Sequence, residues 1–74
     1  MAMAGIHRTI ITAANEMGYF PTQRQAREIN CLWAHRALMS GDTTCTDALM
    51  RQAITDLMER RITDPIERTL LKMK

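Results

Sequence analysis

Residues 46–62 read TDALMRQAITDLMERRI, and the apolar side chains in this stretch recur every three or four positions. That spacing places them on one face of an α-helix. The face consists of Leu49, Met50, Ala53, Ile54, Leu57, Met58 and Ile62. Threonine and aspartate residues just before it can cap a helix. The stretch therefore predicts an amphipathic helix over residues 45–62 with one side buried.

A first helix is predicted over residues 6–17, where apolar residues again follow the helical spacing. Gly18 comes directly after it, at a position where a helix favours a left-handed glycine cap. Residues 1–5 ahead of it are expected to form a flexible N-terminus.

A second helix is predicted over residues 23–39. Thr22 and Gln25 are spaced as a capping box, which marks its start. Its inner stripe is expected to be widened near the end by Leu38 and Met39. Phe20, which precedes the cap, is expected to pack forward onto the helix as a hydrophobic staple does.

A short fourth helix is predicted over residues 65–73, because Asp64 can cap it and Pro65 suits its first turn. No segment alternates apolar and polar residues over a length that would predict a strand. We therefore expect one all-α domain over residues 1–74, a small bundle of three main helices with a short C-terminal helix.

The length of 74 residues bounds the core that one copy can bury. Burial contributes on the order of 25 cal/mol per Å², while ordering costs roughly 1.5 kcal/mol per residue, so the two nearly cancel. We therefore expect a homodimer in which two copies share one core. The shared residues are Met50, Ile54, Leu57, Met58 and Ile62. The alternative is a monomer, since many domains of this size fold alone.

The composition excludes several classes of protein. Ten basic and eight acidic residues leave a formal charge of +2, and 46 % of the residues are apolar, which argues against disorder. No stretch approaches the roughly 20 apolar residues of a transmembrane helix. Two cysteines without a secretory signal favour free thiols and a cytoplasmic location. A chain this short shapes only shallow pockets, so we expect neither an enzyme nor a cofactor.

Two cysteines and two histidines are the candidates for metal or catalytic chemistry. Cys31 and His35 are four residues apart, which aligns them on one helix face. Cys45 and His7 could complete a set of four, but structural zinc sites usually have close ligand pairs at both ends of the motif. We expect no metal site and no catalytic pair, because a helix interior provides little pocket. Zinc binding stays open as an alternative.

Two segments resemble parts of a winged-helix DNA-binding domain. Residues 46–62 resemble its recognition helix, and residues 18–22 are similar to the entry into the second helix of some repressors with that fold. The resemblance implies a regulator that places its third helix in the major groove. Arg24, Arg27 and Arg51 would then contact phosphates. The chain departs from the family in its longer second helix and in lacking a strand pair after the third.

Binding to another protein requires fewer specialised groups of residues than catalysis or DNA recognition. Methionines spread along the chain supply adaptable apolar surface, and aromatic and arginine side chains are typical interface anchors. The expected partner-facing residues are Tyr19, Phe20, Arg24, Arg27 and Arg36. We expect a small regulatory, adaptor or inhibitor protein that binds another protein through a helical surface as a homodimer. The alternative is the DNA-binding regulator.

Overall fold

Four α-helices make up most of the computed structural model, which describes the backbone of residues 2–41 and 46–72 and the side chains of residues 8–41 and 47–72. In chain order they are α1 (Ala2–Glu16), α2 (Gln23–Ser40), α3 (Thr46–Met58) and α4 (Pro65–Lys72). The described residues contain no strand. The predicted all-α class is confirmed.

The first helix begins earlier than predicted. α1 starts at Ala2 instead of Ile6, so the prediction that residues 1–5 precede the helix is wrong. Alanine and methionine are strong helix formers, and Gly5 costs only about 1 kcal/mol within a helix. The helix propensity of the alanine and methionine residues therefore outweighs the cost of Gly5.

The end of α1 is as predicted. Gly18 has a φ of +91°, in the left-handed region that glycine enters without strain. The amide of Gly18 donates to the carbonyl of Asn15 at 3.0 Å, and the amide of Tyr19 donates to that of Ala14 at 2.9 Å. These two bonds form a Schellman cap, which turns the chain sharply into the connection that follows.

The start of α2 is also as predicted. The Thr22 hydroxyl accepts a hydrogen bond from the Gln25 amide at 3.1 Å, and the Gln25 side-chain oxygen accepts one from the Thr22 amide at 2.8 Å. This reciprocal capping box satisfies two backbone donors. The predicted staple is wrong, because Phe20 is 77 % exposed.

The third helix ends before its predicted end at Ile62. α3 stops at Met58, and Arg60 has a φ of +56°. The amide of Arg61 donates to the carbonyl of Asp56 at 2.8 Å, which again forms a Schellman cap. Arginine is not the residue that favours a left-handed conformation, so the sequence carries no signal for this end.

The fourth helix starts as predicted. The carboxylate of Asp64 accepts a hydrogen bond from the Ile66 amide at 2.9 Å, and Pro65 occupies the first helical position. α4 ends at Lys72, whose charge complements the carboxyl end of the helix dipole. The predicted last residue, Met73, lies outside the described residues.

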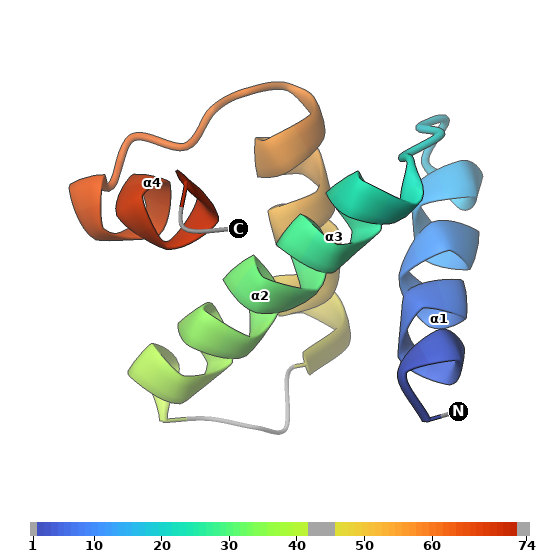
Figure 1. Cartoon of the computed structure of the whole chain (residues 1–74), viewed down its shortest axis with the longest axis horizontal. Coiled ribbons are helices and arrows are strands. Elements are labelled where there is room, and N and C mark those ends of the chain that lie inside the picture. The colour runs from blue at the N-terminus through green and yellow to red at the C-terminus, as the bar shows by residue number, and fades with distance from the viewer. Residues whose placement is uncertain (1, 42–45, 73–74) are drawn as a thin grey trace.

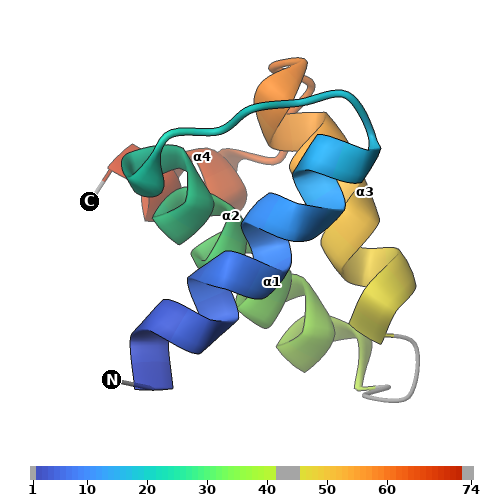
Figure 2. The same ribbon diagram turned by 90° about the vertical axis from the view of Figure 1, so that its right-hand side faces the viewer.

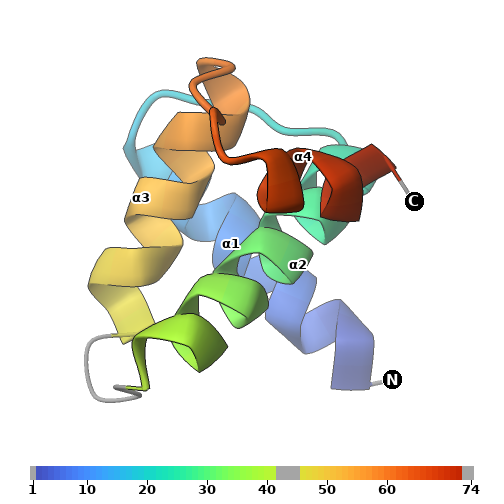
Figure 3. The same ribbon diagram turned by 90° about the vertical axis from the view of Figure 1, so that its left-hand side faces the viewer.

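α2 is the central helix, since it contacts α1, α3 and α4, while α1 also contacts α3. α1 and α4 lie on opposite sides of the molecule (Figure 1), and α4 lies over α2 (Figure 3). The radius of gyration is 11.5 Å, close to the value of about 11 Å for a compact chain of this length. The core consists of Ile10, Ala13, Ala14, Ala26, Ile29, Leu32, Met50, Ala53, Ile54 and Ile62.

The residues expected at a shared dimer core lie in the core of a single copy. Met50 is 4 % exposed, Ile54 0 % and Ile62 9 %. Leu57 and Met58 are partly buried and pack against the same core. Because α1 and α2 already cover this face of α3, a second copy would have to meet the chain elsewhere.

Candidate protein-binding surface

The connection between α1 and α2 carries an exposed aromatic side chain. Residues 17–22 run along one end of the molecule, beside the carboxyl end of α3 (Figure 2). Phe20 is 77 % exposed there, and the exposed Arg24 and Arg27 follow on the first turns of α2. We call Tyr19, Phe20, Arg24 and Arg27 the linker surface. It contains all the expected partner-facing residues except Arg36.

Tyr19 fixes the connection to the body of the protein. Its ring packs against the core, and its hydroxyl donates a hydrogen bond to a carboxylate oxygen of Glu59, just beyond α3. This hydrogen bond is the main cause that raises the pKa of the Tyr19 phenol above its ordinary value, and desolvation adds to it. With Tyr19 held in place, the neighbouring Phe20 is presented to solvent from a fixed backbone.

The two arginines of the linker surface are not held by acidic side chains of the described residues. Arg24 lies in the first turn of α2, where the helix dipole disfavours positive charge and where no acidic residue occurs. Neither Arg24 nor Arg27 forms an ion pair with a side chain of residues 8–41 or 47–72. Both guanidinium groups can therefore bind acidic groups of a partner.

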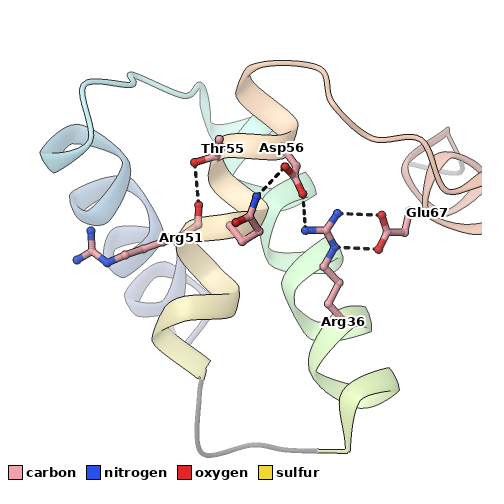
Figure 4. A network of polar contacts seen from close by, with 6 residues as sticks. Arg36, Arg51, Thr55, Asp56 and Glu67 are labelled. Atoms are coloured by element: carbon pink, nitrogen blue, oxygen red, sulfur yellow. Dashed lines mark hydrogen bonds and ion pairs between the residues drawn. The ribbon is translucent and has the colours of Figure 1, made fainter.

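Arg36 lies apart from the linker surface, between α2, α3 and α4 (Figure 4). Its Nε and Nη2 atoms donate to the two carboxylate oxygens of Glu67 at 2.8 and 2.9 Å, and its Nη1 donates to Asp56 at 2.7 Å. The side-chain Nε2 of Gln52 also donates to Asp56, at 3.0 Å. We call Arg36, Asp56 and Glu67 the Arg36 clamp.

The Arg36 clamp is mostly shielded from solvent. The side chains of Arg36, Asp56 and Glu67 are 18 %, 15 % and 10 % exposed. The hydrogen bonds to Glu67, with a smaller effect of the one to Asp56, outweigh desolvation and raise the pKa of the Arg36 guanidinium. The structure thus places Arg36 among the contacts that join three helices, because its Nε, Nη1 and Nη2 atoms all donate to carboxylates within the protein.

Sequence reasoning missed two exposed side chains at the end of α2. Leu38 is 79 % exposed and Met39 70 %. The expectation that they widen the buried stripe is wrong, because the fully buried positions of α2 end at Leu32. Leu38 and Met39 thus lie beyond the last fully buried position of the helix.

Within the described side chains, Cys31 and His35 are not brought together with a third group suited to metal binding. Cys31 and His35 are both half-buried on α2. Among the residues whose side chains are described, no three His, Cys, Asp or Glu lie close enough to hold a metal ion. Cys45 and the side chain of His7 lie outside that part. An open hollow between α2, α3 and α4 is lined mainly by polar side chains, including Glu28 and Arg68.

Comparison of the chain with protein-family models, with curated proteins and with solved structures finds no match. None of the helices in residues 2–41 and 46–72 has the length and apolarity needed to cross a membrane. What the protein does must therefore be inferred from its own side chains.

Proposed function

We propose that this protein is a non-catalytic regulator or adaptor that binds another protein through the linker surface. The observation that carries the proposal is the 77 % exposure of Phe20 on a connection fixed by Tyr19. An aromatic side chain presented from a rigid backbone binds with little loss of conformational entropy. Aromatic and arginine residues are also the commonest energetic centres of protein interfaces.

Charge supports a partner with an acidic segment. Arg24 and Arg27 are exposed on the first turns of α2, which follow Phe20 in the chain, and have no ion-pair partner among the described side chains. Arginine can hold a carboxylate with two parallel hydrogen bonds. A segment that places an apolar side chain against Phe20 and carboxylates against the two arginines would fit this surface.

The exposed side of α3 does not favour DNA recognition. Arg51, its expected phosphate contact, donates to Asp47 at 3.1 Å and to Glu16 at 3.2 Å. Asp47 and Gln52 are exposed on the same helix. A recognition helix needs unpaired basic groups near the phosphates, so DNA binding is kept as the alternative for the experiment to decide.

Affinity capture from the native cell extract, with nuclease present and absent, tests the proposal. The full chain should retain a protein partner in both conditions, and Phe20→Asp should lose it. Leu38→Asp is the matched control, since Leu38 is equally exposed but lies at the other end of α2. Retention by both variants alike would overturn the proposal. Loss of the partner on nuclease treatment would instead support a nucleic-acid target.

A further inference from the structure

α4 leaves part of its apolar surface facing away from the protein. Glu67 is the only buried residue among Pro65–Lys72, and Leu71 packs against the core. Ile66 is 63 % exposed. The outer side forms an almost wholly apolar surface, which we call the α4 stripe, made of Pro65, Ile66, Thr69 and Leu70.

The Arg36 clamp determines this orientation. Glu67 receives two hydrogen bonds from Arg36, so α4 cannot rotate about its axis without breaking them. Rotation would bury Ile66 but leave Arg36 and Glu67 partly buried without counter-charges, which is costly. The fold thus keeps the carboxylate of Glu67 inside and Ile66 outside, while Leu71 packs against the core. The apolar side chains that remain outside are therefore accessible to a partner.

We propose that the α4 stripe binds the α4 stripe of a second copy of this chain, with the two helices antiparallel. Ile66 and Leu70 lie at equal distances along the axis on either side of Arg68, and so do Asp64 and Lys72. One antiparallel register therefore sets Ile66 opposite Leu70 of the second copy. The same register brings the acidic start of one helix to the basic end of the other.

Charge complementarity favours a second copy over an unrelated apolar segment. Asp64 and Lys72 are both exposed at opposite ends of α4, and antiparallel pairing also aligns the two helix dipoles favourably. Arg68 lies at the centre of α4 and would carry the same charge in both copies. Its guanidinium does not oppose the pairing, because its Nε donates to the carbonyl of Ile62 at 2.8 Å. That bond directs the guanidinium toward the connection before α4.

The size of the stripe makes the association weak. Stable interfaces bury about 800 Å² on each partner, whereas α4 has 8 residues and spans only about 12 Å. Self-association therefore occurs at high protein concentration and exchanges rapidly. The α4 stripe shares no residue with the linker surface, so we expect Phe20 to stay accessible in the dimer.

Sedimentation velocity of the full chain tests the proposal, at concentrations from about 10 μM to 1 mM, where weak interfaces assemble. The wild type should shift toward the dimer mass as concentration rises. Ile66→Asp should weaken the association about tenfold or more, because it buries an unpaired charge in each copy. Lys72→Glu should weaken it less, by placing like charges beside Asp64.

Phe20→Asp is the matched control, since it also puts a carboxylate at an exposed apolar position and should dimerise as the wild type does. A monomer at every concentration would overturn the proposal, as would equal behaviour of the wild type and Ile66→Asp. Equal weakening by both aspartate variants would also overturn it. The proposed partner binding is judged separately, because Ile66→Asp should still capture the partner that Phe20→Asp loses.

Discussion

Replacing Arg36 with methionine should destabilise the protein strongly. The change keeps a long side chain but removes three charge-assisted hydrogen bonds, each worth roughly 1.5–3 kcal/mol, and leaves Asp56 and Glu67 without a counter-charge. Since these side chains keep 10 % to 18 % exposure, solvent screens part of the effect. We expect the free energy of unfolding to fall by about 3 kcal/mol, the lower end for a buried pair. The total free energy of unfolding of a chain of this length is about 4–11 kcal/mol.

Urea titration followed by circular dichroism and by the fluorescence of Trp33, the single tryptophan, measures this loss. Arg51→Met is the matched control, because Arg51 also bonds two carboxylates, but its ion pairs involve side chains 40 % to 72 % exposed. Its removal should change stability little, since exposed ion pairs contribute little. A loss below about 1 kcal/mol for Arg36→Met, or equal losses for both variants, would refute the structural role of the clamp.

Three further predictions concern single residues. Arg60→Gly should raise the free energy of unfolding by about 0.5–1 kcal/mol, because Arg60 has a φ of +56°; the same urea titration would contradict this by showing no gain. A spectroscopic titration of Tyr19, the single tyrosine, should report a raised phenol pKa that Glu59→Gln lowers. Since the folded-state pKa is the higher one, the stability that Tyr19 contributes is complete below about pH 10 and is lost as pH rises through that pKa. Ile54→Ala should cost about 2–5 kcal/mol, because Ile54 is 0 % exposed, whereas Leu38→Ala should leave the urea midpoint unchanged.

Helix boundaries that depend on local chemistry were predictable. The glycine cap at Gly18, the capping box of Thr22 and Gln25, and the aspartate cap of Asp64 each involve residues within a few positions of one another. At each of these caps the hydrogen bonds join residues close in sequence, so they form independently of the rest of the chain. The connection that carries Phe20 follows directly from two of these caps.

Boundaries without such a signal were missed. The end of α3 depends on a left-handed Arg60, which no propensity favours. The early start of α1 at Ala2 has no capping residue to mark it. In both cases the apolar spacing alone was a poor guide, because it continues past Met58 to Ile62 and does not define a first residue.

The sequence by itself determined four helices, their approximate positions and the connection between α1 and α2, because caps and helical spacing act over a few residues. Only the tertiary structure decided which side of each helix is buried and which side is exposed. Arg36 pairs with residues 20 and 31 positions away, and no local pattern distinguishes it from the exposed arginines near Phe20. The exposure of Ile66 on α4 depends on the same contacts, because a buried ion pair between distant residues can outweigh the tendency of one short helix to bury all its apolar side chains.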